Sequence, residues 1–178
     1  MADKKKILLF STLNPYPFWA GSENFWFDFV NDKRVNTDFQ FKIMMADSPV
    51  TRKRAEQLSS AGINVTFYKH FNVDFTRRNL FRIGDKVNKR AVRTLPWYKE
   101  ITKNRYDLVW FNVAALADLA ELSYAVQLCR KTNTAYWLIL QHGYEDFFPT
   151  SPEEMDHIIE VATSARRFIF IADKNQIS

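Results

Sequence analysis

The triplet Gly21-Ser22-Glu23 stands at the start of a candidate helix, after a loop that mixes prolines with aromatic residues. Backbone N–H groups and the dipole at a helix N-terminus can hold a phosphate, provided that a glycine lets the group come close. The same triplet also fits a plainer arrangement, in which Gly21 is a turn residue and Ser22 caps the helix. The residues alone leave both interpretations open.

The loop before Gly21 lacks the two best-known phosphate-binding patterns. It contains no glycine, so the G-x-G-x-x-G pattern of dinucleotide-binding folds is absent, and the chain has no Walker lysine motif. Binding of NAD or FAD in the usual manner is therefore disfavoured, and we expect no cofactor.

His142 is a second candidate for chemistry, because it follows an apolar run and precedes Gly143. A neutral imidazole donates or accepts a hydrogen bond near pH 7, so a cleft histidine can contact a substrate. The alternative is a histidine whose ring is satisfied by the backbone. Other polar residues also follow apolar runs, and this candidate set comprises Asn14, Glu23, His70, Asn112 and Gln141.

The elements that must position these residues alternate along the chain. Short runs rich in β-branched and aromatic residues predict strands, and the segments between them carry helical spacing or helix-end signals, such as Gly62 after 49–61. This alternation predicts an α/β fold, a Rossmann-like doubly wound, mostly parallel six-stranded sheet with helices on both faces. The predicted strands are Lys6–Ser11, Phe39–Ala46, Ile63–Lys69, Asp107–Asn112, Ala135–Gln141 and Arg167–Ala172.

Ligands of open parallel sheets bind beyond the carboxyl ends of the strands. The candidate polar residues all lie at or after such ends, so the predicted fold gathers them along one edge of the sheet. Position alone is weak evidence, because the exits of strands are often polar.

Composition indicates one globular domain, residues 1–178, with 47% hydrophobic residues and 16 phenylalanines. The single cysteine, Cys129, makes no internal disulfide, and no Cys/His cluster has zinc spacing, so we expect no metal site. The apolar run Ile7–Phe10 is too short for a signal peptide, and no segment has the length of a membrane span. A cytoplasmic location is the default expectation.

The positive charge is concentrated in one window, 77–105, which holds ten Lys/Arg against Asp85 and Glu100. Four of these residues recur on one stripe of a predicted helix, with an apolar stripe opposite. The stripe fits contact with anionic headgroups at the inner face of a membrane, or with an acidic acceptor, but it equally fits a solvated helix face. No nucleic-acid motif accompanies it. The stripe consists of Arg82, Lys86, Lys89 and Arg93.

The segment NPYPFWAGSENF resembles the start of the retaining GT-B-fold glycosyltransferases of family 4, whose first strand leads into P-x-x-G-G-x-E. Pro17, Ala20, Gly21 and Glu23 match this pattern, with Ala20 in place of its first glycine. LILQHGYED is similar to the family's fifth strand, which ends in a histidine at the active-site cleft. RFIFIADKNQ is similar to its sixth strand, with Ala172 where the family usually has a serine.

The resemblance implies the N-terminal, acceptor-side domain of an enzyme that transfers a sugar from a nucleotide-sugar to a glycan, glycolipid or other acceptor. It assigns Gly21, Ser22 and Glu23 to the donor diphosphate and His142 to catalysis. The family's second, donor-binding domain is not among these residues, so we expect the chain alone to be inactive. The expected acceptor contacts are Asn14, His70, Asn112 and Gln141.

Two other functions remain open at this point. One is a nucleotide- or sugar-binding module without chemistry. The other is an adaptor at a membrane surface that uses the basic stripe.

Overall fold

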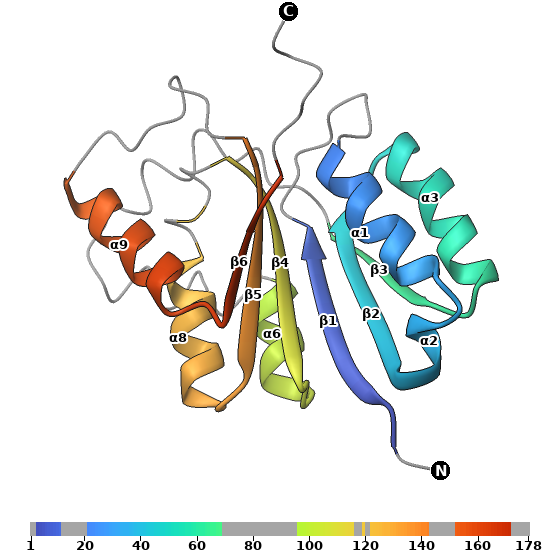
Figure 1. Cartoon of the computed structure of the whole chain (residues 1–178), viewed down its shortest axis with the longest axis horizontal. Helices are drawn as coiled ribbons and strands as arrows, with labels where there is room; N and C mark the ends of the chain where they lie inside the picture. Colours follow the sequence, from blue (N-terminus) through green and yellow to red (C-terminus); the bar gives the residue numbers. More distant parts are fainter. Residues whose placement is uncertain are drawn as a thin grey trace, which may run out of the picture.

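The computed structural model describes residues 3–11, 21–68, 96–115, 119, 122–142 and 152–171. Within them, one all-parallel sheet has the strand order β3-β2-β1-β4-β5-β6, with helices packed on both faces (Figure 1). The fold class predicted from the sequence is confirmed. The strands are β1 (Lys5–Ser11), β2 (Phe39–Ala46), β3 (Asn64–Tyr68), β4 (Leu108–Ala115), β5 (Ala135–His142) and β6 (Arg167–Phe170).

The helices divide between the two faces of the sheet. Buried side chains of α1 and α3 pack on one face, and those of α6, α8 and α9 pack on the other (Figure 1). This division follows from strand order, because the chain winds outward from β1 to β3 and then crosses to β4 on the other side of β1. The helices are α1 (Gly21–Asn31), α2 (Val35–Asp38), α3 (Pro49–Ser60), α6 (Pro96–Lys103), α8 (Ser123–Lys131) and α9 (Pro152–Thr163).

Alternate side chains of strand β1 belong to two apolar layers, one on each face of the sheet. Ile7 and Leu9 belong to the layer that includes Trp26 of α1, whereas Leu8 and Phe10 belong to the layer on the opposite face. Successive side chains of a strand point to opposite faces, so a strand covered on both sides reads as a continuous apolar run. The burial of β1 explains why its sequence has no polar residue between Lys6 and Ser11.

Helix α3 has well-defined ends. Its N-cap is Ser48, whose hydroxyl accepts from the Thr51 backbone N–H at 3.2 Å, while the Thr51 hydroxyl accepts from the Ser48 backbone N–H at 2.9 Å. Pro49 follows at the first helical position, where its missing N–H costs nothing. At the other end, Gly62 adopts a φ of 79°, as the predicted terminating glycine requires.

Every strand except β2 differs from its predicted bounds by one to three residues, and two helices also differ from the sequence-based expectations. Helix α1 begins at Gly21, so Ser22 lies within its first turn and does not precede the helix as a cap. Strand β4 continues to Ala115, three residues beyond its predicted end at Asn112. The short helix α6 lies in the basic window and was not predicted.

Candidate functional site

The candidate site lies where β1 and β4 run side by side. β2 and β3, which follow β1 in the chain, lie on one side of β1, whereas β4, β5 and β6 lie on its other side. The direction of winding therefore reverses between β1 and β4, and open α/β sheets bind ligands at such a topological switch point. Ser11, the last residue of β1, pairs with Asn112 of β4 in the sheet register. Helix α1 starts at the carboxyl end of the sheet, near the end of β1 (Figure 1).

Glu23 joins α1 to both strands. The Asn112 side-chain amide donates to Glu23 Oε1 at 2.6 Å, and the Ser11 hydroxyl donates to the same oxygen at 3.2 Å. All three residues are buried, with Glu23 only 3% exposed and Asn112 fully covered. A buried carboxylate is tolerated only when hydrogen-bond donors compensate for its lost hydration, and the two strand residues supply them. We call Ser11, Glu23 and Asn112 the switch-point cluster.

The cluster sits on the α1 face of the sheet because of strand alternation. Ser11 is two residues beyond Leu9, and Asn112 is two residues beyond Trp110. Leu9 and Trp110 both belong to the apolar layer under α1. Residues two apart on a strand share a face, so both polar side chains continue this layer at its carboxyl edge.

Tyr68 approaches Ser11 from the other side of the sheet. Its hydroxyl, at the end of β3, donates to the Ser11 carbonyl oxygen at 2.5 Å. Its ring stacks on Phe10, with centroids 5.1 Å apart. The end of β1 is therefore tied to β3, β4 and α1. Sequence reasoning did not single out Tyr68, although it stands at the end of a predicted strand.

Asp47 and Arg52 form a second polar pair at this edge, after β2. The Arg52 guanidinium donates to both Asp47 carboxylate oxygens, from Nε at 2.6 Å and from Nη2 at 2.9 Å. This hydrogen bonding to Asp47 raises the pKa of Arg52 above its ordinary value. Sequence reasoning also did not single out this pair. The signal that could have indicated it is an aspartate directly after a predicted strand, followed by an arginine in the first turn of the next helix.

The structure brings two of the sequence-predicted residues, Glu23 and Asn112, into direct contact. Sequence reasoning had given them different partners, with Glu23 on the donor diphosphate and Asn112 on the acceptor. The side chains of both residues are buried and hydrogen-bonded to each other. Their contacts with a donor or an acceptor stay predictions.

Four other predicted residues lie in described elements: Gly21 and Ser22 begin α1, and Gln141 and His142 end β5. The remaining predictions lie outside the described residues; they are Asn14, His70, Arg82, Lys86, Lys89 and Arg93.

The register locates the His142 backbone relative to the switch-point cluster. Ile139 of β5 lies level with Asn112, and His142 pairs with Ala115, three residues further on. At about 3.3 Å of rise per residue, His142 stands roughly 10 Å beyond the level of Asn112. It therefore lies further out at the carboxyl end of the sheet than Ser11 and Asn112, the two donors to Glu23.

Comparison with protein-family models and with curated proteins found no match for this chain.

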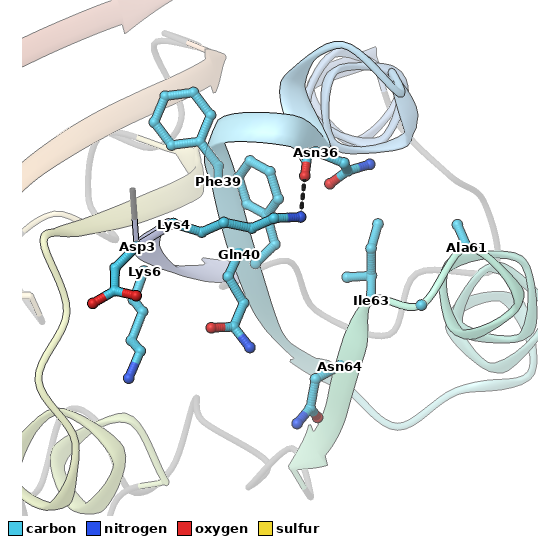
Figure 2. Close-up of a pocket in the computed structure, with 11 residues that line it drawn as sticks. Asp3, Lys4, Lys6, Asn36, Phe39, Gln40, Ala61, Ile63 and Asn64 are labelled. Carbon is cyan, nitrogen blue, oxygen red and sulfur yellow. Dashed lines mark hydrogen bonds between the residues drawn. The ribbon is translucent and has the colours of Figure 1, made fainter. Parts of the chain in front are cut away.

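A surface hollow of about 600 Å³ lies at the opposite edge of the sheet, where the strands begin (Figure 2). Lys4, Phe39, Gln40 and Ile63 line it, and the Lys4 ammonium donates to the Asn36 carbonyl oxygen at 2.6 Å. Because ligands of open α/β sheets bind at the carboxyl edge, we do not assign this hollow to the candidate site.

Neither a metal site nor a membrane-crossing helix is found in the part of the chain that the structure describes. There, no three His, Cys, Asp or Glu residues gather as metal ligands would. No helix among the same residues combines the length and the apolar character that crossing a bilayer requires.

Proposed function

We propose that this chain is the N-terminal, acceptor-side half of a retaining glycosyltransferase that uses a nucleotide-sugar donor. The observation that carries the proposal is the position of the first turn of α1, Gly21 to Glu23, at the switch point between β1 and β4. This is where the family resemblance requires a glycine to face a diphosphate, and where a doubly wound sheet offers a crevice.

In this proposal the chain supplies one wall of a cleft. Gly21 approaches the donor diphosphate, and His142, further out on the same edge, faces the transferred sugar. The acceptor, a glycan or glycolipid, lies against this wall, and a second domain holds the donor. Backbone N–H groups stabilise the departing diphosphate as its charge develops. Half a cleft does not align the two substrates, so the chain alone transfers no sugar.

A nucleotide- or sugar-binding module without chemistry is the second candidate. One observation favours it: the polar side chains described at the switch point, Ser11, Glu23 and Asn112, are hydrogen-bonded within a buried cluster. None of the three is presented on the surface as a general acid or base. Under this alternative the crevice binds a nucleotide or a glycan, and no added donor half makes it a transferase.

The test combines binding with activity. The purified chain is titrated with UDP and GDP by calorimetry and with methyl glycosides of glucose, galactose and mannose by saturation-transfer NMR. We expect binding of at least one of these probes and no transfer or hydrolysis of UDP-glucose or GDP-mannose. Sugar transfer by the chain alone would contradict the half-enzyme proposal, and failure to bind any probe would contradict the binding-module candidate.

His142→Ala separates the two candidates in a protein that carries a donor-binding domain. The transferase proposal predicts a lower kcat with an unchanged melting temperature, because the lost interaction is stronger in the transition state than in the ground state. A binding module predicts no turnover in either protein.

A further inference from the structure

The carboxylate of Glu23 receives hydrogen bonds from two strands that are far apart in the sequence. Ser11 lies 12 residues before it and Asn112 lies 89 residues after it. Glu23 is the third residue of α1, so its side chain connects the first helical turn to the carboxyl end of β1 and to β4. These hydrogen bonds link the start of α1 to two strands of the sheet.

The first turn of a helix needs such an anchor. Its leading N–H groups have no acceptor within the helix, and the turn frays unless side chains or a ligand hold it. A carboxylate in this turn is also favoured by the positive end of the helix dipole. With two donors fixed in the sheet, the direction of the Glu23 side chain sets the direction in which the turn points.

We propose that Ser11 and Asn112 are positioning residues, which act through Glu23 to hold the first turn of α1 over the switch point. The N–H groups of this turn are those that would meet a phosphate, so the cluster sets the geometry of the phosphate-facing surface without touching the ligand. This ligand role rests on the proposed function, whereas the positioning of the helix turn stands on the contacts themselves.

A reciprocal exchange of the two side chains tests the contact. Asn112→Asp puts a second buried carboxylate beside Glu23, and Glu23→Gln removes the negative charge. The double variant Glu23→Gln with Asn112→Asp restores one amide donor facing one carboxylate, with the polarity reversed. We expect Asn112→Asp to loosen the first turn and the double variant to restore it.

Amide hydrogen exchange followed by NMR reads this turn directly. In an α-helix the N–H groups of Phe25, Trp26 and Phe27 bond to the carbonyl oxygens of the first three residues of α1, so their protection reports the turn. We expect about tenfold faster exchange at these three amides in Asn112→Asp, and recovery to within about threefold of wild type in the double variant. The Leu138 amide in β5 serves as the internal reference.

Two further variants keep the test decisive. Ser11→Ala removes the longer of the two hydrogen bonds and is milder, so it replaces Asn112→Asp if that variant does not fold. Ser48→Ala is the matched control, because it removes a buried serine that caps α3 and should loosen α3 without affecting α1.

An equal increase in the exchange rates of the Phe25–Phe27 amides and of the Leu138 amide would overturn the proposal, since it would show a general loss of stability. Absence of rescue in the double variant would overturn it as well.

A separate measurement addresses the ligand. If the wild-type chain binds UDP, Asn112→Asp should weaken this binding by about tenfold, and the double variant should recover it. If the wild-type chain does not bind UDP, the donor contact in the proposed function fails, while the exchange experiment still decides whether the cluster positions α1. Unchanged UDP affinity in Asn112→Asp, together with a loosened first turn, would overturn the ligand role of the cluster.

Discussion

The Tyr68 hydroxyl reaches across a whole strand to donate to the Ser11 carbonyl oxygen, 2.5 Å away. Tyr68 belongs to β3 and Ser11 to β1, and β2 lies between them. The β2 residue that pairs with Tyr68 is Ala46. This hydrogen bond therefore connects the two strands on either side of β2.

The first prediction follows from this hydrogen bond. Tyr68→Phe keeps the ring stacked on Phe10 but removes the hydroxyl, so the free energy of unfolding should fall by about 1 kcal/mol. Tyr68→Ala should cost more, because the ring contact is lost too. Urea denaturation measures both, with Phe67→Leu on the same strand as an exposed control expected to stay within about 0.5 kcal/mol. Equal stability of Tyr68→Phe and wild type would show that the hydrogen bond contributes nothing.

The second prediction concerns Glu100 of α6, which accepts hydrogen bonds from Lys42, at 2.9 Å, and from Tyr106. Burial raises the pKa of Glu100, but the hydrogen bonds from Lys42, Tyr106 and Asn104 together outweigh it and lower the pKa below its ordinary value of 4.5. A lowered pKa in the folded state means that this group stabilises the fold above pH 4.5 and that the contribution is lost as the pH falls through the folded-state pKa.

We therefore expect Glu100→Gln to lower the free energy of unfolding by about 1 to 2 kcal/mol at pH 7. The difference from wild type should shrink as the pH falls below 4.5, since the wild-type carboxyl is then protonated as well. Denaturation at a series of pH values measures this, with Glu56→Gln, an exposed carboxylate on α3, as the control. A difference that stays constant from pH 7 to pH 3 would contradict the assigned ion pair.

The third prediction uses Cys129 as a built-in probe of unfolding. Its thiol is fully buried, and burial raises its pKa to about 12. At pH 8 about one thiol in ten thousand would then be ionised, and the sulfur is also out of reach of reagents. Ellman's reagent should react slowly with the native chain and rapidly once urea has unfolded it. Fast reaction in native buffer would show that α8 opens readily from the sheet.

The fourth prediction concerns Gly62, whose φ of 79° lies in the left-handed region. Nothing stands within 4 Å of the position that a Cβ would take, so a substitution meets only the backbone penalty. Gly62→Ala should therefore destabilise the fold by about 1 kcal/mol, and Gly62→Asn by less, because asparagine tolerates this conformation. Chemical denaturation measures both. An alanine variant as stable as wild type would mean that the turn relaxes to a negative φ.

The fifth prediction tests the basic stripe defined from the sequence. If it meets an anionic surface, binding to vesicles with acidic lipids should weaken as salt rises, because charges are screened within about 10 Å at 0.1 M. Replacing its four residues with glutamine should abolish binding, whereas the same number of exposed lysines elsewhere should be replaceable with little effect. Equal binding to neutral and acidic vesicles would leave the solvated helix face as the explanation. The stripe variants change Arg82, Lys86, Lys89 and Arg93, and the controls change Lys5, Lys33, Lys53 and Lys131.

Strand positions were predictable because their signal is local. Strand β2 was predicted and observed with the same bounds, Phe39–Ala46, since its aromatic residues and its buried end, Ile43–Ala46, are visible in eight residues of sequence. The terminating glycine of α3 is local for the same reason. Predicted strand ends were less accurate where they depend on pairing with a neighbouring strand. Ala114 and Ala115 favour a helix by propensity, yet β4 includes them, because pairing with the end of β5 supplies hydrogen bonds there.

By itself, the sequence determined the fold class, the approximate strands and the edge of the sheet where polar residues gather. Only the tertiary structure decided which of these residues touch. Glu23 and Asn112 are 89 residues apart, and their contact exists because β1 and β4 are neighbours in the sheet. Periodicity reports which face of an element is buried, whereas strand order depends on how all the crossovers pack together. A buried hydrogen bond between a helix and a strand far away in the sequence therefore leaves no local pattern.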